Sequence, residues 1–185
     1  MSRFRHAWAV ALVALFLVPS FAMAQFKAGD FELTLTGQGT NGPDFDGFSA
    51  GATVGIGYFA TDALELAVRQ NVSYNDINGT STNRFGVGGG RATWSGTTAV
   101  AADINFPGMG KFVPFIGANI GYTYGSGDVN DTFVAGPEGG IKWFLTDTAF
   151  VQLIAQYEFN FDKGSSSSAF SDGAFIYGLG IGTRL

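Results

Sequence analysis

The chain has 185 residues and an acidic balance, with 15 Asp and Glu against 10 Lys and Arg. An acidic chain without a basic patch is a poor nucleic-acid binder, so we expect no nucleic acid among its partners. Only 14% of the residues are charged, against about 25% in a typical soluble domain, while aromatic residues make up 15%. The low charge argues against a soluble exterior and favours lipid around the molecule.

Residues 1–24 have the features of an export signal peptide. A basic start precedes an apolar run over residues 7–18, and Ala22-Met23-Ala24 is a small-x-small cleavage pattern. The run is too short to span a bilayer as a helix, which needs about 20 residues. We therefore expect cleavage after Ala24 and one domain over residues 25–185.

The expected mature domain lacks the side chains that most catalytic and metal sites use. The chain contains no cysteine, and its one histidine, His6, lies in the expected signal peptide. Without imidazole, the mature chain has no histidine for a general base, a nucleophile relay or a metal ligand. We expect no catalytic residues, no cofactor and no metal site.

Past residue 24 no window has a convincing helical period, whereas eight segments alternate apolar and polar residues, as strands do. In the third segment, Leu64, Leu66 and Val68 share one face, and Glu65 and Arg69 share the other. In chain order the segments are residues 30–38, 48–58, 64–74, 92–106, 112–124, 133–144, 149–161 and 174–185.

Two of the predicted strands contain proline, which cannot donate a hydrogen bond to its neighbour. Pro114 falls inside the fifth segment and Pro137 inside the sixth. Because proline is tolerated only at strand edges, strand starts and bulges, we expect a bulge or a shifted boundary at each position.

The connections between the segments alternate in length. Short links cover residues 60–62, 107–110 and 145–147, and longer polar links cover residues 40–47, 76–91, 125–132 and 162–173. Transmembrane barrels have short periplasmic turns and longer extracellular loops, with an even strand number placing both termini on the periplasmic side. The sequence therefore predicts an all-β fold, an eight-stranded antiparallel up-and-down transmembrane β-barrel.

Two of the short links share a motif. Tyr58-Phe59-Ala60-Thr61-Asp62 and Trp143-Phe144-Leu145-Thr146-Asp147 both follow the pattern aromatic-Phe-x-Thr-Asp. In a membrane the first aromatic would lie in the interfacial belt, and Thr-Asp suits a turn because it bonds its own backbone. The alternative is an ordinary hairpin turn repeated by chance.

The distribution of residue types indicates which face looks outward. The apolar rows carry aromatic residues toward their ends, such as Phe112 and Tyr124, as two interfacial girdles require. The polar rows hold mostly Gly, Ser, Thr, Asn and Gln, which suits the narrow interior of an eight-stranded barrel. We expect the apolar rows to face lipid and the polar rows to face the lumen.

The chain resembles the small bacterial outer-membrane β-barrel family, which includes the OmpA-type transmembrane domain and OmpX. The most specific pieces are the turn at 143–147, the strand piece at 114–119 and the closing alternation at 177–185. The resemblance implies a location in the cell outer membrane, contacts with lipid and lipopolysaccharide, and folding by the barrel assembly machinery. Family members typically end in an aromatic residue, so Leu185 leaves open whether assembly is weakened.

Charged residues on the polar rows form a candidate lumen charge network. Its members are Glu65, Arg69, Glu138 and Lys142, with Glu32, Asp103, Glu158 and Arg184 as further members. As in OmpA-type barrels, opposite charges across the lumen would plug it with salt bridges, because a confined charge must be paired or reached by water.

These features predict a porin-like barrel with a structural or surface-binding role, a plugged lumen and no enzymatic activity. Known enzymes among small outer-membrane barrels rely on histidine, which the expected mature chain lacks. An extracellular ligand would contact the loops at 76–91 and 162–173. Two alternatives are a narrow channel for ions or small solutes, and a soluble exported barrel that binds an apolar ligand.

Overall fold

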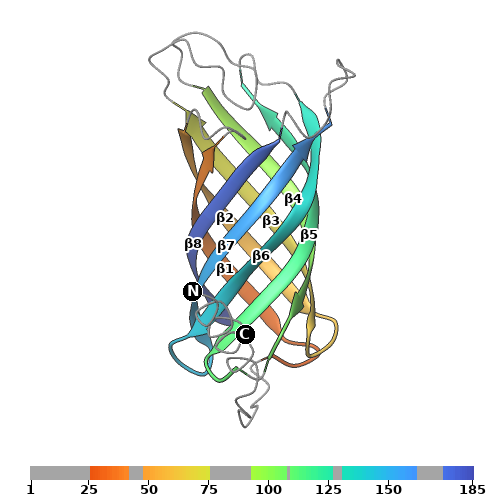
Figure 1. Cartoon of the computed structure of the whole chain (residues 1–185), viewed down its shortest axis with the longest axis vertical. Coiled ribbons are helices and arrows are strands. Elements are labelled where there is room, and N and C mark those ends of the chain that lie inside the picture. Colours follow the sequence, from red (N-terminus) through yellow and green to blue (C-terminus); the bar gives the residue numbers. More distant parts are fainter. Residues whose placement is uncertain (1–25, 42–47, 76–92, 108, 127–130, 162–172) are drawn as a thin grey trace, which may run out of the picture.

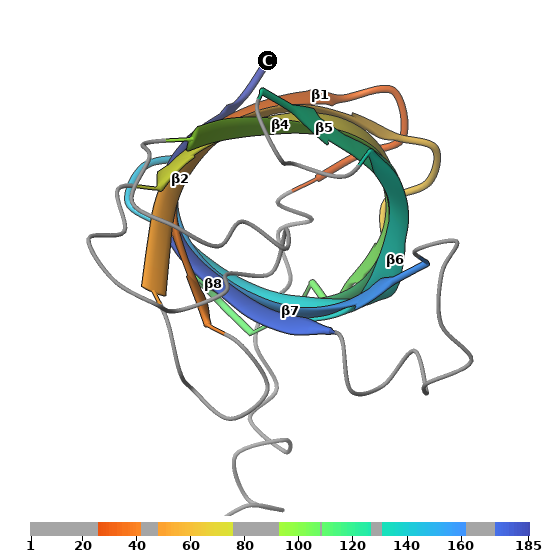
Figure 2. The same ribbon diagram turned by 90° about the horizontal axis from the view of Figure 1, so that it is seen from above.

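The structure, a computed structural model, is a closed barrel of eight antiparallel strands that follow one another in chain order. Figures 1 and 2 show the inclined strands from the side and the closed ring from above. The strands are β1 (Phe31–Asn41), β2 (Phe48–Phe59), β3 (Leu64–Asn75), β4 (Thr93–Asn105), β5 (Phe112–Gly125), β6 (Thr132–Phe144), β7 (Ala149–Asn160) and β8 (Ala174–Arg184). The structure describes residues 26–41, 48–75, 93–107, 109–126, 131–161 and 173–185. Among them, no helix is long and apolar enough to cross a bilayer.

All eight predicted strands are present, and the prediction of an up-and-down barrel is confirmed. The largest difference at a strand end is in β1, which continues past Gln38 to Asn41. These added residues pair with β2 on one side and with β8 on the other. Extending a strand inside a closed barrel is favourable, because each added residue forms backbone hydrogen bonds with its neighbours, which lipid cannot offer.

The predicted bulge or shifted boundary at the two prolines is wrong. The β5–β6 pairing keeps one register through Pro114 and through Ala118 opposite Pro137. Pro114 lies near the start of β5. Its carbonyl accepts a hydrogen bond of 2.8 Å from the backbone N–H of Phe106, which is the residue just after the end of β4. Pro137 interrupts the β6–β7 pairing only locally, since the ladder leaves out Gly136 and Pro137 and then resumes in the same register. Each proline therefore removes a donor without displacing the strand.

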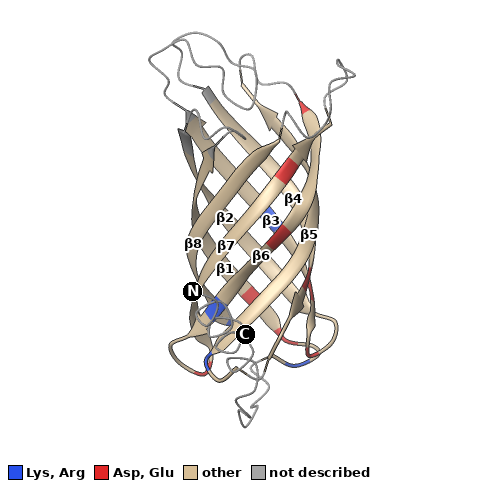
Figure 3. Cartoon of the chain, viewed as in Figure 1, with Lys and Arg blue, Asp and Glu red and all other residues tan. Residues whose placement is uncertain are grey.

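Large apolar side chains cover the outer wall, as predicted. Ile56, Val68, Val100 and Ile120 stand opposite one another across neighbouring strands, and each is about half exposed. Exposed apolar residues in such a continuous band are unsuited to water and match the lipid-facing band of a transmembrane barrel. Figure 3 shows how few charged residues the strands carry.

Aromatic residues gather at both ends of this apolar wall. The end at which the short links join the strands is called the turn end, and the opposite end is called the loop end. At the turn end, the rings of Phe112 and Trp143 stack with centroids 5.7 Å apart. At the loop end, Tyr122 and Phe133 meet edge to face at 5.0 Å. Such pairs form the two girdles expected at the membrane interfaces.

The lumen as candidate functional site

Arg69 forms the centre of a buried charge cluster that crosses the lumen. From β3, its Nη2 pairs with Asp103 Oδ2 on β4 at 2.6 Å, and its Nη1 pairs with Glu138 Oε1 on β6 at 2.5 Å. Asn119 on β5 donates to the other oxygen of Glu138 at 2.6 Å. These four residues are called the arginine cluster. They tie four strands together across the barrel interior.

Lys142 forms the centre of a second cluster, nearer the turn end. Its Nζ lies 2.7 Å from Glu32 Oε2 and 2.7 Å from Glu65 Oε2. Asn105 donates to the same Glu65 oxygen at 3.2 Å. These four residues are called the lysine cluster. All four are buried, so the ion pairs are shielded from water.

The four residues predicted as one network lie in the lumen, but they are divided between these two clusters. Glu65 pairs with Lys142, and Arg69 pairs with Glu138. Each cation also has a second carboxylate partner, Glu32 or Asp103, both of which the sequence suggested as further members.

Of the two remaining suggested members, Glu158 lines the same cavity as Arg69, and Arg184 lies near the turn end. Glu158 is buried in the lumen wall and accepts a hydrogen bond from Gln156 Nε2 at 2.7 Å. Arg184 Nη1 lies 3.6 Å from Asp30 Oδ2, and both side chains are partly exposed.

Each of the two lumen cations therefore has two carboxylate partners. With Arg69 and Lys142 positive, and Glu32, Glu65, Asp103 and Glu138 negative, the six groups sum to 2 − 4 = −2 if all are ionised. Buried charges stay in a protein when close partners and hydrogen bonds offset the loss of water. The asparagine amides in both clusters supply such additional hydrogen bonds.

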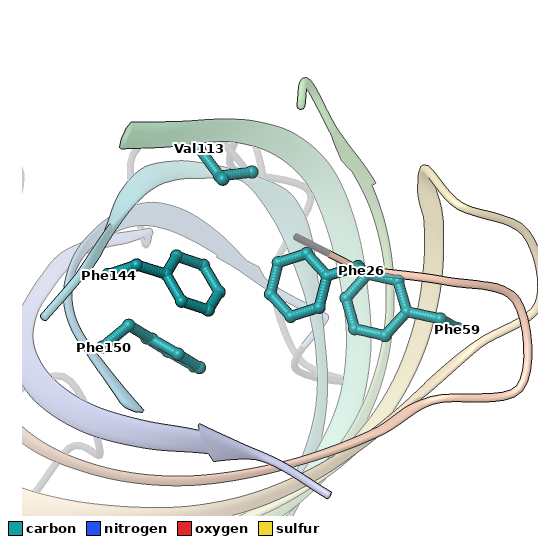
Figure 4. Packing of buried hydrophobic residues seen from close by; sticks show 5 residues of the cluster. All are labelled: Phe26, Phe59, Val113, Phe144 and Phe150. Atoms are coloured by element: carbon teal, nitrogen blue, oxygen red, sulfur yellow. The ribbon is translucent and has the colours of Figure 1, made fainter. Parts of the chain in front are cut away.

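Apolar side chains fill the lumen at the turn end, below the lysine cluster. Phe26 stacks on Phe59 with ring centroids 4.1 Å apart, and it meets Phe144 edge-on at 5.3 Å. Phe150 and Val113 complete this group, and each of the five residues is at most 2% exposed. They are called the apolar plug. Figure 4 shows the plug residues gathered inside the barrel.

The sequence interpretation missed the apolar plug, although the repeated turn motif carried part of the signal. Tyr58 and Trp143, the first aromatics of the two motifs, are exposed, whereas the following residues, Phe59 and Phe144, are buried. The strand alternation places successive residues on opposite faces, so each motif supplies one girdle residue and one plug residue. Phe26 precedes the first strand and belongs to no alternating segment, so no pattern pointed to it.

The two motifs also fold in the same way. Thr61 Oγ1 accepts from Leu64 N at 2.9 Å, and Thr146 Oγ1 accepts from Ala149 N at 2.9 Å. The predicted turn role of threonine is confirmed. Asp62 differs from the expectation, because its carboxylate accepts from the backbone N–H of Ala28 at 2.9 Å.

The two cavities that the described lumen residues line are small. A polar cavity of about 50 Å³ lies on the loop side of Arg69, lined by residues such as Gln38, Thr53 and Asn71. Between Arg69 and Lys142 the cavity volume falls to about 10 Å³. A single water molecule needs about 10 to 15 Å³, so the space between the two cations holds one water at most.

Comparison with protein-family models finds no match, and neither does comparison with curated proteins. Among solved structures, the chain is similar to the outer membrane protein OprG of Pseudomonas aeruginosa, at 12% identity and a TM-score of 0.63 over 88% of this chain and 98% of that chain. The fold is that of a small outer-membrane barrel.

Two other solved structures show the same likeness. The N-terminal β-barrel domain of Pseudomonas aeruginosa OprF has 16% identity and a TM-score of 0.57, over 83% of this chain and 97% of that chain. Neisserial surface protein A has 12% identity and a TM-score of 0.58, over 86% of this chain and 97% of that chain. At such identities the likeness extends to the fold alone.

The predicted location in the cell outer membrane is confirmed by two independent features. One is the fold, and the other is the exposed apolar wall with its aromatic girdles. Because barrels of this kind have short periplasmic turns, we expect the turn end to be the periplasmic end.

Other sequence-based predictions fall partly or wholly outside the described residues. The signal peptide at 1–24 and the loop at 76–91 lie outside, and Gly173 is the one described residue of the loop at 162–173. Within the described ranges, no group of three or more His, Cys, Asp or Glu side chains is arranged to hold a metal ion.

Proposed function

We propose that the protein is a non-conducting outer-membrane barrel with a plugged lumen and a structural or surface-binding role. The observation that carries this proposal is the succession of obstacles along the lumen. From the loop end inward, a solute meets the arginine cluster, a space of about 10 Å³, the lysine cluster and the apolar plug.

The charge clusters and the apolar plug close the lumen for different physical reasons. The two charge clusters bind strands from opposite sides of the barrel through short ion pairs, so opening them would leave buried charges without partners. The apolar plug excludes hydrated ions, because they would lose water without gaining a polar partner. A barrel closed in series by both kinds of barrier is suited to rigidity rather than transport.

Ion flux from sealed vesicles tests the closed lumen. We expect vesicles containing the purified barrel to release potassium no faster than protein-free vesicles. Arg69→Ala removes the cation that holds Asp103 and Glu138, but it should leave the vesicles tight, because the lysine cluster and the apolar plug still close the lumen. Wild-type flux well above the protein-free rate would contradict the proposal.

A narrow cation channel is the second candidate function, and one observation favours it. The six charged groups of the two clusters carry a formal surplus of −2, which would attract cations and repel anions in a path along the lumen. In this case the wild type itself would release potassium, with selectivity for cations over anions. The third alternative, a soluble barrel, conflicts with the exposed apolar wall.

The surface-binding part of the proposal concerns the longer loops. Rigid scaffolds commonly present binding residues on their connecting loops. We propose lipopolysaccharide or another extracellular ligand as the partner of residues 76–91 and 162–173. Replacing each loop with a short Gly-Ser linker should reduce binding to lipopolysaccharide vesicles while the barrel still folds. Unchanged binding in both variants would contradict this assignment.

We also propose that the protein has no enzymatic activity and is assembled by the barrel assembly machinery. The absence of histidine and cysteine after residue 24 supports the first point. The membrane-barrel fold supports the second. Leu185→Phe tests whether the last residue limits assembly: it should raise the folded fraction in cells if an aromatic end is recognised better. An unchanged fraction would mean that Leu185 suffices.

A further inference from the structure

We infer that residues Phe26–Asp30 form a stopper that closes the periplasmic mouth of the lumen by inserting the Phe26 ring beneath Lys142. This stopper is attached to the barrel differently from the strands, so it is the part of the lumen closure that can be withdrawn. The inference rests on the proposed plugged lumen and assigns its periplasmic closure to one short segment.

The stopper is held by a compact turn. Gly29 N donates to Phe59 O at 2.8 Å, and Asp30 N donates to Lys27 O at 3.0 Å. Lys27 N donates to the Asp30 carboxylate at 2.9 Å. Gly29 has a φ of 95°, a backbone conformation that other residues adopt only with strain. The glycine lets the chain reverse just before β1, which directs Phe26 into the barrel.

Phe26 completes an aromatic enclosure around the buried ammonium group. Lys142 Nζ lies 4.9 Å from the centroid of the Phe26 ring, closer than to the rings of Phe59, Phe115 and Phe150 at 5.5, 5.4 and 5.6 Å. Cations within about 6 Å of an aromatic face are attracted to it. Of these four rings, only that of Phe26 comes from outside the strands.

The position of Phe26 makes it separable from the barrel wall. The other ring-bearing residues belong to strands that are paired along both edges, so their backbones cannot move without breaking a ladder. Phe26 precedes β1 and is not part of a strand ladder. Its segment is held by the turn, by two backbone hydrogen bonds with Phe59 at the end of β2, by the Asp62 hydrogen bond, by the Arg184–Asp30 pair and by the packing of the Phe26 ring. Withdrawal of the stopper would open the lysine cluster to the periplasm and leave the strands intact.

The absence of cysteine makes a direct accessibility test possible. Ala67 is buried and lines the small space between Arg69 and Lys142. Ala67→Cys places a single thiol there. In protein purified from the outer membrane of cells that exported it, the rate of modification of this thiol by a small cationic methanethiosulfonate reagent is measured. With the stopper in place, the thiol should react at least tenfold more slowly than a thiol in the unfolded chain.

Two variants then test the stopper, one by removing its ring and the other by removing a contact that holds its backbone. Phe26→Ala removes the ring, and Asp62→Ala removes the carboxylate that binds Ala28 N while leaving every plug residue in place. Both should speed modification of the thiol, Phe26→Ala by about tenfold and Asp62→Ala by less. Asp147→Ala is the matched control, because Asp147 occupies the same motif position in the other turn and is exposed; it should leave the rate unchanged.

The possible outcomes distinguish a failure of the stopper proposal from a failure of the plugged-lumen proposal. Heat-modifiable migration in gels reports whether each variant has folded, so rates are compared only among folded barrels. An unchanged rate in folded Phe26→Ala would overturn the stopper while leaving the plugged lumen standing. A thiol that already reacts at the unfolded rate in the Ala67→Cys parent would instead contradict the plugged lumen itself.

Discussion

At the scale of single residues, glycines on the lumen rows make room for charged side chains of the neighbouring strand. A Cβ atom at Gly57 would collide with the carboxylate of Glu65, and one at Gly117 would collide with that of Asp103. Both carboxylates belong to the charge clusters. The small size of these two glycines is therefore a condition for the ion pairs to Lys142 and Arg69.

Gly57→Ala should destabilise the barrel by displacing Glu65 from Lys142. Overpacking a well-filled interior typically costs about 1 to 3 kcal/mol. The matched control is Gly37→Ala, where a Cβ would have one neighbour, the Leu179 carbonyl oxygen, at 3.8 Å. Urea unfolding from lipid vesicles measures both. Equal stability of the two variants would show that the space over Gly57 is unimportant.

Lys142→Met alone should destabilise the barrel more than a triple variant that neutralises all three charged side chains of the lysine cluster. Taking away the cation leaves Glu32 and Glu65 buried without their partner, which typically costs about 3 to 5 kcal/mol. Adding Glu32→Gln and Glu65→Gln neutralises the stranded charges and should recover part of this loss. Unfolding free energies of the single and triple variants decide the point. A triple variant less stable than the single would contradict this account of the cluster.

At the scale of elements, the repeated turn motif positions one girdle residue, one plug residue and one turn hydroxyl each time. Its geometry is the same at both occurrences, including the hydrogen bonds from Ala60 N to Leu64 O and from Leu145 N to Ala149 O, both at 2.9 Å. The motif thus fixes the turn ends of β2 and β6 relative to the strands that follow them.

Thr61→Ala should weaken the first of these turns, because it removes the acceptor for Leu64 N and Ala63 N. A hydrogen bond of this kind contributes about 0.5 to 1.5 kcal/mol. Thr61→Ser keeps the hydroxyl and should stay close to the wild type, and Thr146→Ala and Thr146→Ser should repeat the contrast. If the serine and alanine variants unfold at the same urea concentration, the hydroxyl is not what holds the turn.

The strands were predictable from the sequence, because a period of two is a local property that each segment shows by itself. The divided charge network was not predictable. Lys142 meets Glu32 across the lumen although they are 110 residues apart, and such meetings depend on the stagger of the strands around the barrel. Alternation fixes which face a side chain takes, and leaves open which side chains meet inside.

The apolar plug shows the same limit in another form. The alternation placed Phe144 on a lumen row within the predicted sixth segment, and Phe59 by extension one residue beyond the second. Their common partner, Phe26, lies before the first strand, in a segment with no periodicity. A plug that depends on a residue before the first strand has no complete repeating signal, so the sequence pattern did not predict it.

At the scale of the whole molecule, the barrel holds its charged clusters inside, above the apolar plug, and carries an apolar outer wall, whereas a soluble domain exposes its charges. Val68→Arg tests this arrangement, because Val68 lies near the middle of β3 and is 56% exposed on the outer wall. A lipid-facing arginine near the bilayer midplane costs about 2 to 4 kcal/mol, falling to about 0 to 1 kcal/mol at the interfaces.

Ala60→Arg is the control for this change, since Ala60 is an exposed residue of the first periplasmic turn. Unfolding from vesicles should show a much larger loss of stability for Val68→Arg than for Ala60→Arg. Similar losses at the two positions would mean that the wall around Val68 does not lie in the hydrocarbon core.

The closed lumen is the central claim, and single-channel recording across a planar bilayer tests it most directly. With the arginine cluster, the lysine cluster and the apolar plug in series, we predict that wild-type barrels inserted in the bilayer give no discrete current steps. Stable, reproducible steps from the wild type, carried by cations and lost in Glu138→Ala, would contradict the plugged barrel and establish the lumen as a channel.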